Sequence, residues 1–176
     1  MTLPEPWLRG PLPGVPRELM PAAHALAQAA EDIPRAVLVP APLGAELLWA
    51  RPGGAASVGF HLRHVAGSID RLLTYAAGGV LGEAQRGFLG AEGDRSAGPA
   101  EAEALTGLAT AAVERALATL RATDVARLHE PRGVGRLALP SSLFGLLFHV
   151  AEHTQRHVGQ IVTTARIVRG LGVGDG

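Results

Sequence analysis

The sequence predicts an all-α protein, organised as a four-helix bundle, on three observations. Four segments place apolar residues at helical spacing, no segment alternates apolar and polar residues convincingly, and proline and glycine separate the segments. Hydrophobic residues make up 47% of the chain and aromatic residues only 4%, so alanine, leucine and valine must form the core. Alanine and leucine are strong helix formers. A length of 176 residues favours one domain.

The first helix is expected over residues 16–32, and Pro21 should kink it or delay its start. Pro34 should close this helix, because proline fits poorly beyond the first turn. Residues 34–54 are rich in proline and should form a connection, with a short helical turn at 45–50. The apolar stripe of the first helix consists of Leu19, Ala22, Ala23, Leu26, Ala29 and Ala30.

The second helix is expected over residues 57–77, with Ser57 as its N-cap and Gly78 after its end. Its apolar residues lie within about 80° of one another at 100° per residue, which indicates one buried face. They are Val58, Leu62, Val65, Ile69, Leu72 and Ala76. Residues 78–98 are polar and rich in glycine, so we expect a long connection there.

The third helix is expected over residues 99–123, with Leu105, Leu108, Ala112, Leu117 and Leu120 in its stripe. Residues 124–139 should form a loop that holds, at most, a short extended piece. The last helix is expected from Pro140 or Ser141 to Arg169, because glycines follow and arginine suits a helix C-terminus.

These helices place the predicted bundle at residues 16–170, after an extended N-terminal segment 1–15 and before a flexible C-terminus 171–176. The N-terminal segment has several prolines and no apolar run, unlike a signal peptide. No apolar run reaches the ~18 residues of a membrane span. A cytoplasmic location and no membrane partner are therefore expected.

Composition removes several classes of chemistry. The chain has no cysteine, which excludes disulfides, thiolate metal sites and cysteine nucleophiles. All 16 basic residues are arginine, which excludes a lysine Schiff base and a lysine phosphate loop. Sixteen acidic residues balance them, so the chain has no net basic charge to attract nucleic acid, and we expect no such partner.

Histidine spacing is the most informative local pattern. Three of the seven histidines, His149, His153 and His157, stand four residues apart on the last helix, and His61 and His64 stand on the second. Residues four apart on a helix lie one above the other, so two imidazoles can hold one metal ion. A core histidine that only forms hydrogen bonds is the competing interpretation, and spacing alone leaves the two about even.

The apolar stripes indicate which histidines face inward. On the last helix, His157 falls inside the stripe, His153 at its edge and His149 outside it. On the second helix, periodicity slightly favours His61 over His64. Helices in bundles often bury two faces, so this preference leaves both histidines of the second helix open.

Two segments resemble the DinB/YfiT-like superfamily of metal-dependent enzymes. The last helix contains FHVAEHTQRHVGQI, which is similar to the family's H-x3-H-x-G-Q ending, and the second contains SVGFHLRHVAGSIDRLLTY, which resembles the family's first ligand-bearing helix. The resemblance covers residues 16–170 and implies a four-helix bundle with metal ligands His64, His153 and His157. His61 and His149 could then hydrogen-bond a ligand or a bound substrate.

A divalent ion on three imidazoles keeps an open position, as catalytic sites do. Zinc, nickel, iron and manganese all accept imidazole. Hydrolase-type chemistry through metal-bound water is expected on a small-molecule substrate. The alternatives are an S-transferase or isomerase that uses a low-molecular-weight thiol, and a non-catalytic, stress-related metal-binding protein.

Other site residues are harder to assign from the sequence. No Asp or Glu clearly shares the predicted face, so a general base stays open. Arg71 could bind an anionic substrate group, although an exposed arginine paired with a carboxylate is the simpler interpretation. Gln160 could orient metal-bound water or hydrogen-bond a buried carbonyl.

A second apolar face on the last helix predicts a homodimer. Phe144, Phe148 and Val162 lie away from its main stripe, and an exposed apolar face of this kind is typical of a partner surface. The segment 34–54 could cover this face instead.

Overall fold

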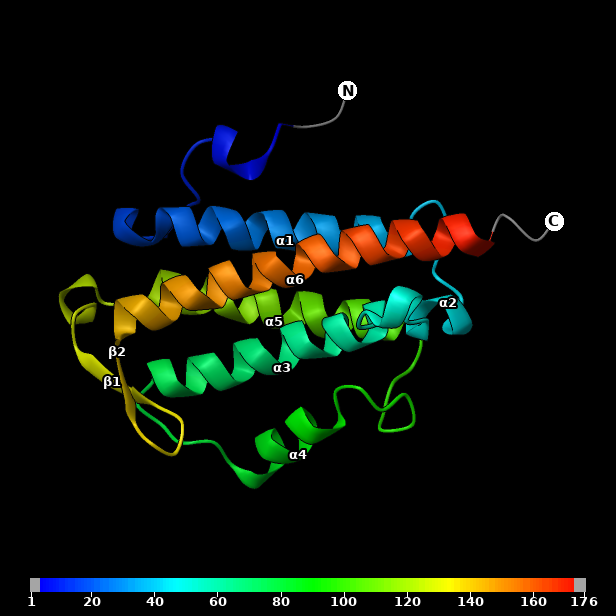
Figure 1. Ribbon diagram of the computed structural model, residues 1–176. Helices are drawn as coiled ribbons and strands as arrows, with labels where there is room; N and C mark the ends of the chain where they lie inside the picture. Colours follow the sequence, from blue (N-terminus) through cyan, green and yellow to red (C-terminus); the bar gives the residue numbers. More distant parts are fainter. Residues whose placement is uncertain (1–3, 173–176) are drawn as a thin grey trace.

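The computed structural model describes residues 4–172, which form six α-helices and one two-stranded antiparallel sheet. The all-α prediction is confirmed. The four long helices are α1 (Met20–Leu38), α3 (Val58–Ala76), α5 (Ala102–Ala122) and α6 (Leu143–Gly172). Each packs against two of the others, in the order α1, α6, α3, α5 and back to α1. Figure 1 shows the four lying side by side along one axis.

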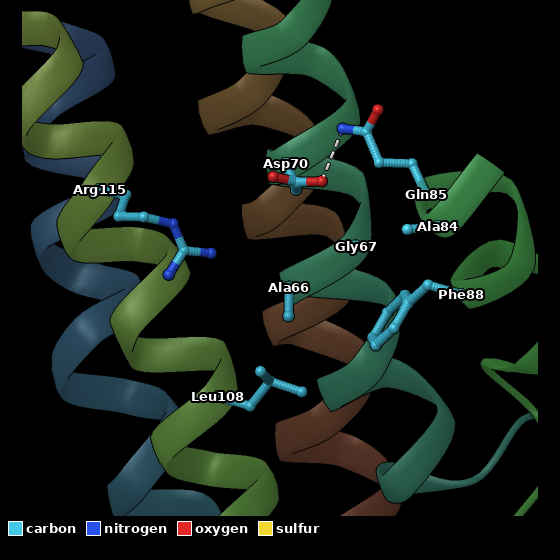
Figure 2. A pocket seen from close by; sticks show the side chains of 8 residues that line it. All are labelled: Ala66, Gly67, Asp70, Ala84, Gln85, Phe88, Leu108 and Arg115. Carbon is cyan, nitrogen blue, oxygen red and sulfur yellow. Dashed lines mark hydrogen bonds between the residues drawn. The ribbon is translucent and has the colours of Figure 1, made fainter. Parts of the chain in front are cut away.

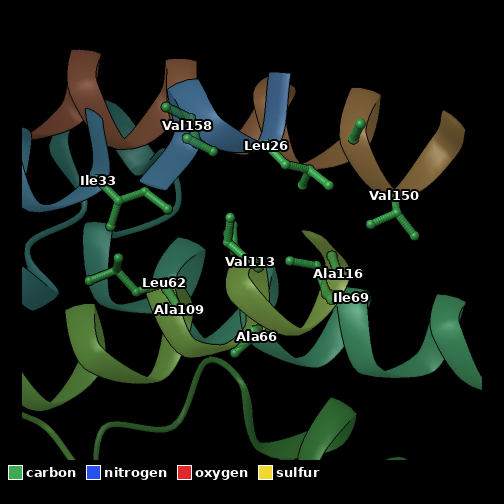
Figure 3. Packing of buried hydrophobic residues seen from close by; sticks show 14 of the residues in the cluster. Leu26, Ile33, Leu62, Ala66, Ile69, Ala109, Val113, Ala116, Val150 and Val158 are labelled. Atoms are coloured by element: carbon green, nitrogen blue, oxygen red, sulfur yellow. The ribbon is translucent and has the colours of Figure 1, made fainter. Parts of the chain in front are cut away.

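The core fills the space between these helices with aliphatic side chains. Leu26 and Ile33 of α1 lie on one side of it and Leu62 and Ile69 of α3 on the other, and all four are fully buried (Figure 3). The remaining labelled core residues are Ala66, Ala109, Val113, Ala116, Val150 and Val158. Small alanine side chains let the helices approach closely. The close-packed core fixes the positions of α3 and α6, and with them the side chains that lie between these two helices.

The first helix extends beyond its predicted end. It runs to Leu38 with Pro34 inside it, so the prediction that Pro34 closes the helix was wrong. Ile33 and Val37 are fully buried, and their burial offsets the one helical hydrogen bond that proline removes. Pro21 falls in the first turn, where its missing N–H costs no helical hydrogen bond.

The N-cap of α3 was predicted correctly. The side chain of Ser57 accepts a hydrogen bond from the backbone N–H of Phe60 at 3.1 Å. The short helical turn predicted at 45–50 is α2 (Ala45–Trp49).

Residues 78–98 are not only a connection. They contain α4 (Glu83–Ala91), which packs outside the four long helices and against α3 (Figure 1). The sequence prediction missed this helix because Gly87 and Gly90 give it low helix propensity. A side-chain cap supports its start, where Gln85 accepts from the backbone N–H of Gly82 at 3.0 Å.

Residues 131–142 form a small antiparallel hairpin, where the sequence predicted a loop with at most one short extended piece. Strands β1 (Pro131–Val134) and β2 (Leu139–Ser142) pair in antiparallel register. The last helix therefore begins at Leu143, not at Pro140 or Ser141, because those residues belong to β2. Its first N–H groups bond to carbonyls of the preceding segment, from Leu143 to Glu130 at 3.0 Å and from Phe144 to Leu128 at 2.8 Å.

The ends of the chain differ partly from expectation. Pro6–Leu8 form a short 3₁₀ turn inside the N-terminal segment that was expected to be extended. Residues 171 and 172 belong to α6, and the rest of the predicted flexible C-terminus lies outside the described residues. No helix within residues 4–172 is both long and apolar enough to cross a membrane.

The apolar face predicted on the last helix is divided in the structure. Phe144 and Phe148 are 38% and 53% exposed, whereas Val162 packs against the core. The two phenylalanines remain a surface on which a second copy could bind. The homodimer stays a prediction.

Candidate metal centre

The contact between α3 and α6 gathers the histidines of both helices. His64 of α3 and His153 and His157 of α6 each direct one ring nitrogen to a common point, and these three nitrogens lie within 4.8 Å of one another. All three rings are partly buried. The rings of His64 and His157 have centroids 4.4 Å apart, and those of His153 and His157 are 4.6 Å apart.

The nitrogen spacing fits a divalent ion. Nitrogens that coordinate a tetrahedral zinc ion at 2.0–2.1 Å lie about 3.3 Å from one another. Nε2 of His64 lies 2.9 Å from Nε2 of His153, and the third nitrogen falls inside the same 4.8 Å limit. The three nitrogens would have to move by a few tenths of an ångström to somewhat more than one ångström to reach the spacing of metal ligands. The residues present therefore fit a three-histidine metal centre.

A carboxylate that the sequence prediction missed completes this centre. Glu92 follows the C-terminus of α4 and its side chain is only 2% exposed. It lies 2.7 Å from Nδ1 of His64 and accepts a hydrogen bond from Arg71, also at 2.7 Å. Burial by itself would raise the pKa of Glu92, but the hydrogen bonds from His64 and Arg71 outweigh burial and lower it. Glu92 is therefore an ionised carboxylate at neutral pH.

The charge of Glu92 fixes the proton of His64. An ionised carboxylate only accepts hydrogen bonds, so Nδ1 of His64 carries the proton and donates. The other ring nitrogen, Nε2 of His64, faces His153 and lies 2.9 Å from Nε2 of that residue. A histidine whose second nitrogen donates to a carboxylate is the usual arrangement of a metal ligand. Glu92 thus orients the ring of His64, as it would for a metal ligand.

His61 supports His157 from the other side. The side chain of His61 is buried, and its Nδ1 lies 3.0 Å from Nδ1 of His157. One of these two nitrogens donates a hydrogen bond to the other, and this contact holds the ring of His157 in place. Both histidines of α3 therefore face the centre, but the three-nitrogen group contains His64 and not His61.

Three of these histidines, His61, His153 and His157, have a lowered pKa and are neutral at physiological pH. Burial and the neighbouring imidazoles lower the pKa of His157 to about 3, and burial and His64 lower the pKa of His61 to about 4. Burial and His64 also lower the pKa of His153. Neutral imidazole is the form that binds metal, so protons compete weakly for this site at pH 7.

The site depends on a close approach between α4 and α3 at Gly67. Figure 2 shows Gly67 facing Phe88, which belongs to α4. A β-carbon on Gly67 would lie 2.5 Å from Oε1 of Glu92 and 2.8 Å from a ring carbon of Phe88. Only glycine leaves the space through which Glu92 reaches His64 and Arg71.

A Gly67→Ala substitution should therefore destabilise the protein by about 1–3 kcal/mol, the usual cost of overpacking. Gly90→Ala in α4 is the matched control, because its β-carbon would meet open space. That control should stabilise by roughly 0.5–1 kcal/mol through helix propensity. Urea denaturation measures both, and equal stability of Gly67→Ala and the unmodified protein would contradict the described packing of α4.

The remaining predicted site residues are Arg71, His149 and Gln160. Arg71 is buried and bound to Glu92, so the prediction of an exposed arginine was wrong while its pairing with a carboxylate was right. His149 lies beside His153, with ring centroids 5.3 Å apart, and its Nδ1 is 3.1 Å from Glu152. Gln160 is exposed, and within residues 4–172 it forms no side-chain hydrogen bond to a residue of the centre.

Comparison with known proteins identifies the family of the chain. The model of the DinB superfamily matches residues 21–161, which include α3 and α5 whole, α1 and α6 in part, and every histidine of the centre. No curated protein matches the chain.

Proposed function

Because the chain belongs to the DinB superfamily, we propose that it is a metal-dependent enzyme in which His64, His153 and His157 hold one divalent ion. The convergence of these three imidazoles carries the proposal. Three protein ligands leave at least one coordination position for a water molecule or a substrate, as in catalytic and not structural centres. Imidazole suits zinc, nickel, iron and manganese, so the ligand set does not select one metal.

The chemistry that we propose is hydrolysis. When bound, a divalent ion polarises a carbonyl or phosphoryl oxygen and lowers the pKa of coordinated water to about 7. The chain's own residues orient the ligands, because Glu92 holds His64 and His61 holds His157. The remaining requirement is a group that accepts and returns a proton.

His149 is the residue that we assign to proton transfer. It lines a cavity together with His64 and His153, so it faces the open side of the centre. Glu152 lies 3.1 Å from its Nδ1 and can hold the proton there, which leaves Nε2 to accept a proton. A histidine oriented by a carboxylate in this way is a common general base.

The test is a substrate screen on protein loaded separately with zinc, nickel, manganese or iron(II). We expect metal-dependent hydrolysis of activated esters or amides. The His149→Ala variant should keep its metal and lose about 100-fold or more of the rate, as general-base removal does.

Two other results would replace this proposal. Conjugation of glutathione or cysteine to an electrophile, without hydrolysis, would indicate the thiol-dependent transferase instead. Neither reaction with any of the four metals bound would indicate a non-catalytic metal-binding protein.

A further inference from the structure

A cavity of about 280 Å³ opens directly beside the candidate metal centre. His64 and His153 form part of its lining, and Ser68 and Arg71 of α3 lie next to them. This volume is at or below the small end of the range for ligand pockets, which is about 300–1,000 Å³. A molecule bound there would therefore be small.

One wall of the cavity contains no candidate metal ligand, and its side chains are mainly apolar. Leu72 and Tyr75 of α3 form one part, and Leu81 and Leu89 form the other. Leu89 belongs to α4 and Leu81 precedes that helix. The position of this part of the wall therefore depends on α4, which the contact between Glu92 and His64 holds in place. Leu89 is 46% exposed, which leaves its apolar surface available for a ligand.

The cavity has little net charge away from the metal position. Among its lining residues that the structure describes, Arg71 alone has a permanent charge, and that charge is paired with Glu92 at 2.7 Å. No carboxylate lines the cavity within that same set of residues. A charged group placed there would lose its hydration without a free partner of opposite charge.

Resting on the proposed metal centre, we infer that this site selects substrates with one metal-binding head and a short, uncharged, apolar tail. The head takes the open position beside His64 and His153. The tail lies against Leu72, Tyr75, Leu81 and Leu89. Burial of roughly 100 Å² of apolar tail, at about 25 cal/mol per Å², corresponds to about 70-fold in affinity.

Hydroxamic acids with one common head test this inference by calorimetry on the zinc-loaded protein. Benzohydroxamate and hexanohydroxamate should bind at least tenfold tighter than acetohydroxamate. A negative charge on the tail, as in 4-carboxybenzohydroxamate, should remove this gain.

Variants of the apolar wall test where the tail of the hydroxamate binds. Leu81→Ala combined with Leu89→Ala should reduce the preference for long tails and leave acetohydroxamate affinity and zinc content unchanged. Leu137→Ala is the matched control, because Leu137 is 83% exposed and does not line the cavity. It should keep the full preference.

The outcomes separate this inference from the proposed function. Zinc uptake with equal affinity for all the hydroxamates, or with tightest binding of the carboxylated one, would overturn the inference and leave the metal centre standing. Absence of zinc uptake would overturn the metal centre, and the inference with it.

Discussion

Replacement of Glu92 by alanine should cost about 3–5 kcal/mol of stability, the usual cost of leaving one charge of a buried pair without its partner. Glu92 is 2% exposed and Arg71 has a side chain that is 10% exposed, so solvent cannot replace the lost carboxylate. The same change removes the acceptor that fixes the proton of His64. Urea denaturation in the presence of a chelator measures the stability term without any contribution from bound metal.

Two further variants serve as comparisons, one for the charge of Glu92 and one for its burial. Glu92→Gln keeps a hydrogen-bond acceptor of similar size, so it should lose less stability than Glu92→Ala. Glu46→Ala removes an exposed partner of Arg95 and should cost at most about 1 kcal/mol, because exposed ion pairs contribute little. A Glu92→Ala variant as stable as Glu46→Ala would contradict the burial of the Glu92–Arg71 pair.

The second large effect concerns metal affinity. His64→Ala and His153→Ala should each weaken zinc binding by at least about 100-fold, because each removes one of three nitrogens that meet within 4.8 Å. Loss of a residue that only orients a ligand costs roughly 10–100-fold. Competition with a chromogenic chelator measures these affinities.

Two histidines provide the comparison. His61→Ala should fall in the lower range, since His61 contacts His157 but lies outside the three-nitrogen group. His129→Ala should have no effect, because His129 is exposed and outside that group. Unchanged affinity in His64→Ala, together with a large loss in His61→Ala, would move the ligand on α3 from His64 to His61.

The clustering of the histidines could be predicted in part from the sequence. The four-residue spacing on α6 placed His153 and His157 together, and their nitrogens do meet a nitrogen of α3. Periodicity slightly favoured His61, whereas the three-nitrogen group contains His64, which the family resemblance had indicated. A helical wheel assumes a single buried face and therefore gave a weak preference here. In the structure both face α6, with His61 against His157 and His64 against His153.

Glu92 could not be predicted, for a physical reason. It is 28 residues from His64 along the chain and follows a helix with weak helix formers. Its position depends on tertiary packing of α4 against Gly67 and on the ion pair with Arg71. None of these contacts produces a periodic pattern in the sequence.

The boundaries of the elements show the same limit. Pro34 normally indicates a helix end, but burial of Ile33 and Val37 continues α1 past it. The small sheet has Pro131 and Gly133 in one strand, which local propensity disfavours. In both elements, tertiary contacts outweigh local propensity. The local sequence does not reveal such contacts.

Elemental analysis of the untagged, purified protein tests the central claim most directly. The protein should carry about one divalent ion per chain, as isolated or after incubation with zinc or nickel followed by gel filtration. Chains without bound metal after both treatments would contradict the three-histidine centre. The histidines between α3 and α6 would then be hydrogen-bonded core residues.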